Sequence, residues 1–245
     1  MAESSRIKAP AGTEPLFAAR AKELALQMSQ FSVEELKRLL QVNGKIALQN
    51  YRRFQEFHDA DGAALQAVLA YTGIVFKRLR PQDFTAADFL YAQEHLRLTS
   101  FCYGLLRPLD RIRNYRMEGG ICLPELGSDN VFDYWKPLLT GPFIEAVWQQ
   151  GGVLVNLASA EMKQLFDWKR VEKEVTVITP EFQVEKDGKP ATVVIYTKMC
   201  RGEMARYILK NRLARPEALT GFVFDGFTFR PELSDDATYR FTLRT

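Results

Sequence analysis

The chain has 245 residues, of which 47% are hydrophobic and 12% aromatic, and its 33 basic and 30 acidic side chains leave a formal net charge of +3. This length and composition are sufficient to bury a sizeable core in one domain spanning residues 1–245. Apolar runs such as Val153–Val155 are far shorter than the roughly 18 residues of a membrane span, and Met1–Pro15 does not resemble a signal peptide. We therefore expect a cytoplasmic protein with no membrane partner.

The first half of the chain predicts helices. A helix start near Thr13 is followed by apolar residues at helical spacing as far as Met28. Ser32 and Glu35 have the spacing of a capping box, which predicts the start of a second helix. The same periodicity predicts three further helices, the last of them capped by Thr85: Gly44–Phe57, Gly62–Tyr71 and Ala86–Leu98.

The segment Leu96–Glu118 concentrates basic charge around a break in helical periodicity. Its two apolar runs, interrupted at Tyr103, Gly104 and Pro108, predict two short helices joined by a tight turn, a helix-hairpin-helix-like element. Five arginines lie in this segment: Arg97, Arg107, Arg111, Arg113 and Arg116. Turn amides and a helix N-terminus can face a phosphate oxygen while arginines bind its neighbours, which is the chemistry of sequence-independent binding to a nucleic-acid backbone. A solvated structural helix pair is the alternative.

The second half predicts more strands. Val153–Leu157 is typical of a buried strand, and two apolar segments, Val175–Thr179 and Thr192–Thr197, flank a turn signal at Asp187-Gly188. A helix is predicted over Glu203–Leu213. Two closing strands are predicted at Phe222–Phe229 and Tyr239–Leu243. Because there is no long linker and no repeat, we predict a single α+β domain with a helical first half and a β-rich second half.

A second basic segment lies within Tyr196–Arg215. It sets six basic side chains against one acid, Glu203: Lys198, Arg201, Arg206, Lys210, Arg212 and Arg215. Since the whole chain is only +3, the positive charge is concentrated in the two basic segments and the remainder is net acidic. A protein of this kind can present a basic cleft to a polyanion although its overall charge is small.

Soft metal ligands are few and scattered. Cys102, Cys122 and Cys200 are odd in number and widely spaced, which argues against a disulfide framework and fits a reducing compartment. Neither His58 nor His95 has a second histidine or cysteine three or four residues away, as a helical metal pair requires. We therefore expect no metal and no cofactor.

Both basic segments carry a family resemblance. SFCYGLLRPLDRIRNYRME, NLAS with Glu161, KMCRGEMARYI and LTGFVFDGFTF occur in an order that resembles the YaaA family of bacterial peroxide-stress proteins, from about Phe17 to Phe229. The resemblance implies a cytoplasmic mixed α/β protein with a positively charged cleft, a helix-hairpin-helix-like element, DNA binding, and a role in limiting oxidative damage linked to intracellular iron. Family members open with a short apolar strand and a Ser-Pro-Ala-Lys-like turn, whereas this chain opens with MAESS. We therefore expect a missing strand, a missing cleft lysine and an uncovered strand edge.

Two functions from different classes remain. The first is DNA binding through the cleft, with contacts from Tyr103, Gly104, Arg107, Arg111, Arg113, Arg116, Lys198, Arg201 and Arg206. The second is an enzyme that acts on a small anionic substrate in the same cleft, where Glu161, Tyr115 or Lys198 transfers protons. The phosphate-loop, dinucleotide-binding and nucleophile-elbow motifs are absent, so we favour a protein that is not an enzyme.

Four polar residues are candidates for the cleft lining: Asp110 in the first basic segment, and Asn156, Ser159 and Glu161 near the predicted strand end. Polar groups at such strand ends often line a cleft in α/β proteins. Ser159 also fits a simple helix cap, and Glu161 fits an acid in the first turn of a helix. The sequence leaves these alternatives open.

Overall fold

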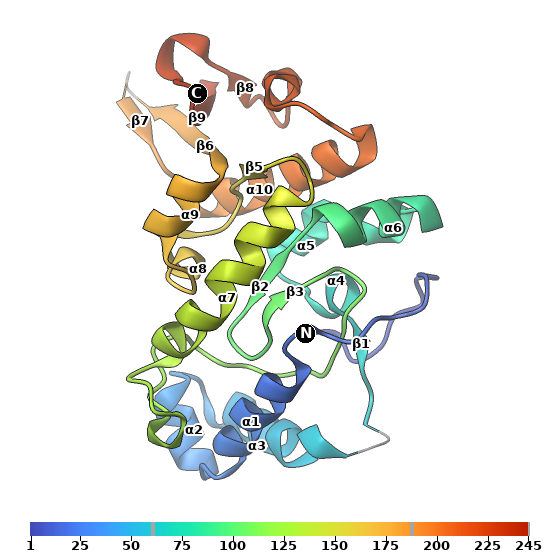
Figure 1. Ribbon diagram of the computed structural model, residues 1–245, viewed down its shortest axis with the longest axis vertical. Coiled ribbons are helices and arrows are strands. Elements are labelled where there is room, and N and C mark those ends of the chain that lie inside the picture. The colour runs from blue at the N-terminus through green and yellow to red at the C-terminus, as the bar shows by residue number, and fades with distance from the viewer. Residues whose placement is uncertain (60–61, 187–188, 245) are drawn as a thin grey trace.

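The computed structural model describes three stretches of the chain: residues 1–59, 62–186 and 189–244. The molecule is elongated (Figure 1). One end is formed by three helices: α1 (Ala18–Ser29), α2 (Val33–Leu39) and α3 (Gly44–Gln55). The other end holds two long strands: β6 (Thr176–Lys186) and β9 (Thr238–Arg244). Helix α7 (Val131–Trp148) runs between the two ends.

Capping residues mark the starts of α2 and α3 at the helical end of the molecule. Ser32 Oγ accepts a hydrogen bond from the Glu35 amide at 3.3 Å, and the Glu35 carboxylate accepts one from the Ser32 amide at 2.8 Å. These reciprocal bonds satisfy amides that a helix start otherwise leaves unpaired. Asn43 caps α3 with a single contact, in which its side-chain oxygen accepts a hydrogen bond from the Ile46 amide at 3.0 Å. All three predicted helices are confirmed, although α1 starts later than predicted because Thr13 instead forms an isolated β-bridge with Asp110.

The segment that follows α3 has less helix than predicted. Of the helix predicted over 62–71, only α4 (Ala67–Ala70) forms. The two residues before it make strand β1 (Leu65–Gln66), which pairs antiparallel with β4 (Arg111–Ile112). Pairing with a distant segment therefore overrides the local helical periodicity here.

Two further helices lie beside the long C-terminal helix α10 (Val194–Asn211). The sequence does not predict α5 (Ile74–Leu79), whose six residues are too few to show a helical period. The predicted helix α6 (Ala86–His95) is confirmed, and Thr85 and Asp88 form its capping box. Both helices pack against α10.

A β-hairpin lies where two short helices were expected. β2 (Leu98–Ser100) pairs antiparallel with β3 (Gly104–Leu106). The chain reverses between these strands, where Ser100 Oγ accepts a hydrogen bond from the Tyr103 amide at 2.8 Å. Gly104 has φ of +69°, and an added Cβ would lie 2.8 Å from the ring of Trp135 in α7. The helix-hairpin-helix prediction is therefore wrong for this segment, because a short apolar run fits a buried strand as well as a helix.

Helix α7 is long and contains two prolines. Pro137 and Pro142 lack the amide hydrogen that a helix interior normally uses, which hides this helix from the sequence. Asn130 caps its start. Trp135 is fully buried, and its Nε1 donates a hydrogen bond to the Phe101 carbonyl at 2.8 Å, which links α7 to the turn of the β-hairpin.

A mixed sheet forms the other end of the molecule. β5 (Val153–Val155) and β9 both run parallel to β6. β7 (Lys189–Ala191) pairs antiparallel with β6, and β8 (Thr228–Phe229) pairs antiparallel with β9. Two short helices lie between β5 and β6: α8 (Ala160–Lys163) and α9 (Trp168–Glu174). In the described sheet β5 is an edge strand, as expected, but Val153 is 38% exposed, so its predicted burial is wrong.

The other strand predictions are confirmed in one case, confirmed in part in another and wrong in a third. The strand predicted at 239–243 is confirmed within β9, and that predicted at 222–229 shrinks to the two residues of β8. The strand predicted at 192–197 is wrong, because α10 begins at Val194. Its β-branched residues favour a strand locally, but packing against α5 decides for a helix. The turn predicted at Asp187-Gly188 lies outside the described residues.

The hydrophobic core confirms the α+β class. One cluster joins the N-terminal helices to α7 and the β-hairpin, with Leu24, Phe54 and Trp135 at its centre. Another lies between the sheet and α10, around Phe227 and Phe241. Within the described ranges, no helix is both long and apolar enough to cross a membrane.

Helices α10 and α5 approach each other closely at Gly202. An added Cβ at Gly202 would lie 2.2 Å from the Val75 carbonyl oxygen and 2.7 Å from Arg78 Cβ. Backbone atoms cannot move away as a flexible side chain can. Glycine at 202 therefore permits α10 to lie directly on α5.

This contact can be tested with two matched glycine substitutions. We expect Gly202→Ala to lower the free energy of unfolding by about 1–3 kcal/mol, because the methyl group overlaps the Val75 carbonyl. Gly44→Ala at the first position of α3, where an added Cβ meets nothing within 4 Å, should leave it unchanged or raise it by up to about 1 kcal/mol. Both positions are helical, so the difference isolates the contact. Urea denaturation measures it, and equal effects of both substitutions would contradict the contact.

Candidate functional site

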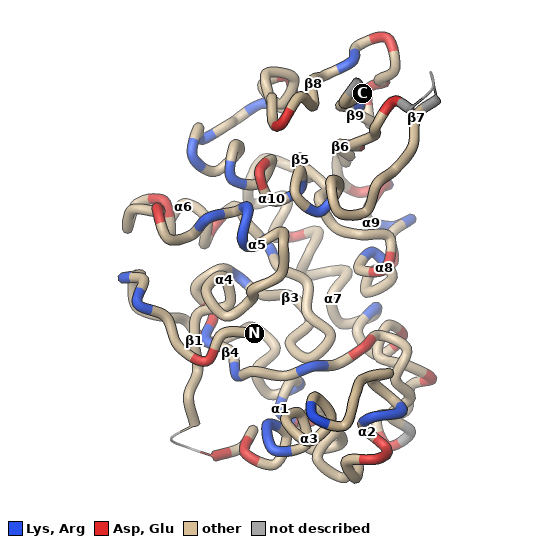
Figure 2. The backbone as a smooth tube through the Cα atoms, turned by 180° about the vertical axis from the view of Figure 1, so that it is seen from behind, with Lys and Arg blue, Asp and Glu red and all other residues tan. Residues whose placement is uncertain are grey.

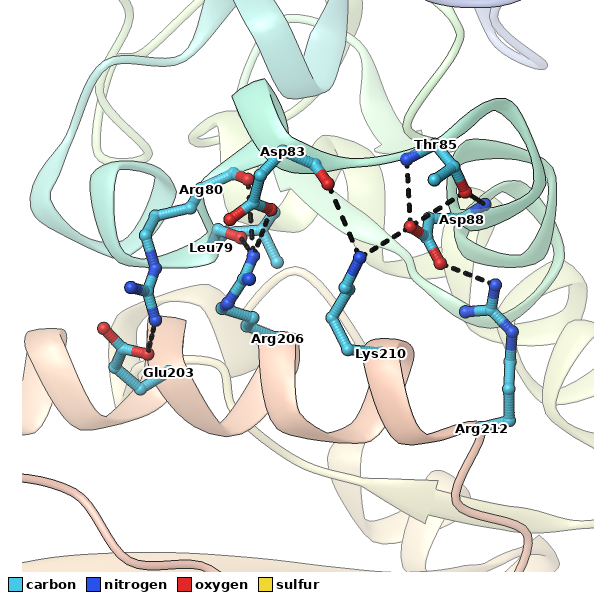
Figure 3. Close-up of polar contacts among 9 residues, drawn as sticks. All are labelled: Leu79, Arg80, Asp83, Thr85, Asp88, Glu203, Arg206, Lys210 and Arg212. Carbon is cyan, nitrogen blue, oxygen red and sulfur yellow. Dashed lines mark hydrogen bonds and ion pairs between the residues drawn. The ribbon is translucent and has the colours of Figure 1, made fainter.

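Helix α10 presents its basic residues on two different sides. One stripe at helical spacing lines a cavity: Lys198, Arg201, Ala205, Ile208 and Leu209. Another stripe faces the segment joining α5 to α6 and forms ion pairs there (Figure 3). Because a helix has 3.6 residues per turn, basic charge that is continuous in the sequence is divided in space.

Acidic partners occupy the ion-pairing side of α10. Arg206 contacts the Asp83 carboxylate at 2.6 Å, and Arg80 donates to the Glu203 carboxylate at 2.7 Å (Figure 3). Arg206 also reaches the Leu79 carbonyl at 3.4 Å. The structure thus places Arg206, one of the expected nucleic-acid contacts, in a helix-to-helix contact.

Asp88 lies on the same ion-pairing side of α10 and is buried. Its carboxylate accepts hydrogen bonds from Lys210 at 2.8 Å, from Arg212 at 2.7 Å and from the Thr85 amide at 2.9 Å. Burial raises the pKa of Asp88, but these hydrogen bonds outweigh burial and hold the pKa well below its usual range. This carboxylate therefore fixes the C-terminal part of α10 to the cap of α6.

The cavity on the other side of α10 has a volume of about 880 Å³. Apolar and aromatic side chains form most of its wall, among them Phe76, Phe143 and Trp168. Basic side chains from distant parts of the chain also line it: Arg97, Arg116, Lys163, Lys198, Arg201 and Arg215. An apolar cavity of this size with a few polar groups is typical of a ligand site. Within the described residues it is the strongest candidate for a functional site.

Arg201, Lys198 and exposed Arg215 are available cations at this cavity. None of the three forms an ion pair or a side-chain hydrogen bond with the described part of the chain. Arg201 is half-buried, and burial lowers the pKa of its guanidinium. A guanidinium remains charged near neutral pH even so, and it is stabilised when an anion approaches. The cavity wall is therefore suited to an anionic ligand.

Two other arginines of the cavity have local partners. Arg116 pairs with Glu118 at 3.0 Å, and both side chains are partly exposed. Arg97 donates to the carbonyls of Gln93 and Glu94 at 3.2 and 2.9 Å, and burial, together with the charge of Arg107, lowers its pKa. The sequence names Arg97 among the five arginines, but it provides no signal that this residue, Lys163 and Arg215 reach one cavity.

Arg107 does not reach the cavity lining. Its guanidinium donates to Asp110 at 2.9 Å and to the Glu14 carbonyl at 3.1 Å. Asp110 is fully buried and also accepts hydrogen bonds from the Arg107 amide and from the Thr13 hydroxyl, at 2.7 and 2.6 Å. This pair fixes the turn after β3. Of the seven basic residues expected as nucleic-acid contacts, Arg116, Lys198 and Arg201 line the cavity, whereas Arg107, Arg111, Arg113 and Arg206 are outside its lining.

The remaining residues of the arginine-rich segment also lie outside the cavity lining. The Tyr103 hydroxyl is buried and accepts a hydrogen bond from the Arg113 amide at 2.9 Å. The Arg113 guanidinium donates to the carbonyls of Glu56, at 2.8 Å, and Asp59. Arg111 is exposed on β4. With Gly104 packed against α7, these residues support the local fold.

Of the polar residues after β5, some line the cavity and one does not. Asn156 and Ser159 line the cavity. Ser159 also caps α8, since its hydroxyl accepts a hydrogen bond from the Met162 amide at 3.3 Å, so the capping interpretation is correct. Glu161 is exposed on α8 and is not part of the cavity lining.

A chain of three hydroxyl groups also borders the cavity. The Tyr115 hydroxyl lies 2.8 Å from that of Tyr71 and 2.6 Å from Ser100 Oγ. Burial raises the pKa of Tyr71 to about 12 and that of Tyr115 well above its usual value, so both stay protonated at neutral pH. Tyr115 is a sequence candidate. Tyr71 and Ser100 are missed, because nothing in the sequence shows that they meet.

Two features bear on redox chemistry. In the described part of the chain, no three His, Cys, Asp or Glu side chains come together as a metal site. Cys102 and Cys200 are buried, whereas Cys122 is exposed. Burial raises the pKa of Cys200 to about 12, which outweighs the basic residues next to it in the sequence.

Known proteins similar to this chain can now be named. The chain matches the family described as peroxide stress protein YaaA over residues 1–233. It is 64% identical to a UPF0246 protein of Bacteroides fragilis, over 99% of this chain and 94% of that protein. It is 63% identical to a UPF0246 protein of Bacteroides thetaiotaomicron, over 96% and 92% of the two chains. The chain therefore belongs to the YaaA family, as its motifs predict, and membership supports a role in peroxide stress.

The Asp88 contacts predict acid sensitivity. Because the pKa of Asp88 is lowered by folding, its stabilising effect is complete above the ordinary aspartate pKa of about 3.9 and is lost as the pH falls below that value. We expect Asp88→Asn to lower the free energy of unfolding at pH 7 by about 1–3 kcal/mol. Its loss of stability between pH 5 and pH 2 should also be smaller than that of the wild type. Urea denaturation across this pH range measures both effects, with exposed Asp129→Asn as the control. Parallel pH curves for wild type and Asp88→Asn would contradict the assignment.

The cysteines predict selective labelling. We expect iodoacetamide to modify Cys122 in the folded protein and to modify Cys102 and Cys200 only after denaturation, because the two buried thiols are protonated and shielded. Mass spectrometry of tryptic peptides measures the modification. Modification of Cys200 in the folded protein at the rate of Cys122 would show that this thiol is reactive.

Proposed function

We propose that this chain acts in peroxide stress by binding the phosphate backbone of DNA through the basic side chains of the cavity wall, and that this binding limits oxidative damage linked to intracellular iron. The observation that carries the proposal is the convergence of Arg116, Lys198 and Arg201 on one cavity. These residues belong to two basic segments that are far apart in the sequence. A shared position for separate basic segments supports a common anionic ligand.

Charge availability favours this site over others on the molecule. Lys and Arg positions occur along the whole backbone, with Asp and Glu positions among them (Figure 2). On the other side of α10, Arg206, Lys210 and Arg212 are already paired with carboxylates. Unpaired cations gain most from a phosphate, since binding releases counterions from DNA without breaking a pair inside the protein.

Arg201 and Lys198 suit different parts of a phosphate contact. Arg201 offers a planar guanidinium that can hold two phosphate oxygens at once, whereas Lys198 offers a compact charge on a flexible stem. Neither side chain is arranged to identify a base by itself. The expected binding is therefore independent of base sequence.

A second function is favoured by the largely apolar lining of the same cavity. A small anionic substrate would fit there, with Arg201 binding its charge. Tyr115 and Lys198 border this cavity, so a proton transfer would fall to them, while Glu161 lies outside the lining. The Tyr115 hydroxyl stays protonated and suits the role of donor.

Salt titration separates the two functions. We expect Lys198→Ala and Arg201→Ala each to weaken binding to duplex DNA equally for all base sequences and to reduce the slope of log K against log salt by about 0.9 per lost contact. Arg201→Lys should retain part of the affinity. Arg111→Ala, an exposed arginine outside the cavity, is the matched control and should change affinity less. Fluorescence anisotropy with labelled duplex at several salt concentrations measures these values.

Two results would overturn the DNA proposal. One is unchanged affinity and salt slope for both Lys198→Ala and Arg201→Ala. The other is an effect of Arg111→Ala as large as theirs, because the contact would then lie on the surface near β4. Weak DNA binding that none of the substitutions changes is the result expected for the small-substrate enzyme.

A further inference from the structure

We propose that the cavity beside α10 receives one unpaired nucleotide of the bound DNA, with its base against the aromatic wall and its phosphate at Arg201 and Lys198. This inference rests on the proposed DNA binding and adds the part of the DNA that is recognised. It concerns nucleotides that have left the base stack at a bulge, a mismatch or a damaged position.

The size of the cavity sets the first limit. About 880 Å³ lies within the range of small-molecule sites and is ample for one nucleotide, but a duplex is too wide to enter. Duplex DNA that meets the cations at the wall therefore leaves the apolar volume unfilled. A nucleotide displaced from the stack fills it while its backbone stays outside.

The wall chemistry matches the two halves of a nucleotide. Half-buried Phe76 and Trp168 line the cavity. Tyr71 stacks on one face of Phe76 and Lys163 Nζ lies 4.9 Å from the centroid of the Trp168 ring, so the opposite faces are the ones on which a base can stack. Arg201 and Lys198 contribute positive charge. The two parts are continuous in space. Gly202, next to Arg201, packs on the Val75 carbonyl, and the neighbouring Phe76 ring stacks on Tyr71 at a centroid distance of 4.9 Å.

The hydroxyl chain supplies a hydrogen-bond donor at this wall. Tyr71, Tyr115 and Ser100 have three hydroxyl protons, but the two contacts among them use only two. Ser100 Oγ accepts its further hydrogen bond from the Tyr103 amide, so that bond uses no hydroxyl proton. One hydroxyl proton is thus left without an acceptor among the described residues. Base carbonyls and ring nitrogens are acceptors of this kind.

These features favour a nucleotide over an acyl chain. An aliphatic carboxylate would satisfy the cations and the apolar wall, but its acceptor oxygens all lie at the charged group, and its chain offers no acceptor to the remaining hydroxyl proton. A base has such an acceptor and also stacks on aromatic rings, with a gain that does not depend on base identity. A free nucleotide has the same chemistry, and the experiment must distinguish it from a nucleotide within DNA.

The test compares three duplexes of one sequence: fully paired, with one bulged nucleotide, and with the same bulge lacking its base. We expect the bulged duplex to bind about tenfold more tightly than the paired one, and the abasic bulge to lose most of that advantage. Because the two bulged duplexes have the same extra backbone unit and differ only in its base, the difference between them reports the base. Ala146→Phe, which fills the cavity from α7, should bring the ratio of bulged to paired affinity close to one. Exposed Ala19→Phe in α1 is the control and should preserve the ratio.

The outcomes distinguish this inference from the proposed function. Equal binding of bulged and abasic duplexes by the wild type, with binding still dependent on Arg201, overturns the nucleotide inference and leaves backbone binding intact. A ratio unchanged by Ala146→Phe overturns it as well. Tight binding of deoxynucleoside monophosphates without any advantage for the bulged duplex identifies a free nucleotide as the occupant, which also overturns it. Failure to bind any of the duplexes overturns both proposals.

Discussion

The close approach of α10 to α5 is the constraint on which the rest of this structure depends. Gly202 allows the helix backbone to lie against the Val75 carbonyl. This contact fixes the rotation of α10 about its axis, and that rotation decides which residues face the α5–α6 segment and which face the cavity. A rotation of a third of a turn would direct Arg201 toward the acids of that segment and leave the cavity without one of its available cations.

Electrostatics reinforces this arrangement. On one side of α10, Asp83, Asp88 and arginine-bound Glu203 complete a set of ion pairs that join the helix to its neighbours (Figure 3). On the other side, Arg201 is half-buried without a carboxylate partner among the described residues, which lowers its pKa and is unfavourable for folding alone. A protein retains an unfavourable group where a ligand compensates for it. The basic residues on the ion-pairing side of α10 are thus satisfied within the protein. The cavity side, where Arg201 has no carboxylate partner among the described residues, therefore indicates more about ligand binding.

Much of the fold is readable from local signals. Ser32, Asn43 and Thr85 cap α2, α3 and α6 through contacts that span only three residues, so capping patterns identify these helices. Elements that depend on distant partners are harder to predict. The β-hairpin needs Gly104 to fit against α7, and α7 itself is obscured by two internal prolines. α10 begins within a β-branched segment because it packs on α5, a contact between residues far apart in the chain.

The candidate site shows the same difference between local signals in the sequence and contacts between distant segments. By itself, the sequence determined the family and the two basic segments, and it included Arg116, Lys198 and Arg201 among the candidates. Only the tertiary structure decided which of these charges are available, because each depends on a carboxylate or carbonyl from another part of the chain. Arg107 is bound by Asp110 and Arg206 by Asp83, whereas Arg201 faces the cavity. Residue type records the capacity of a side chain to bind an anion, but the packing of distant segments determines whether that capacity is already satisfied within the protein.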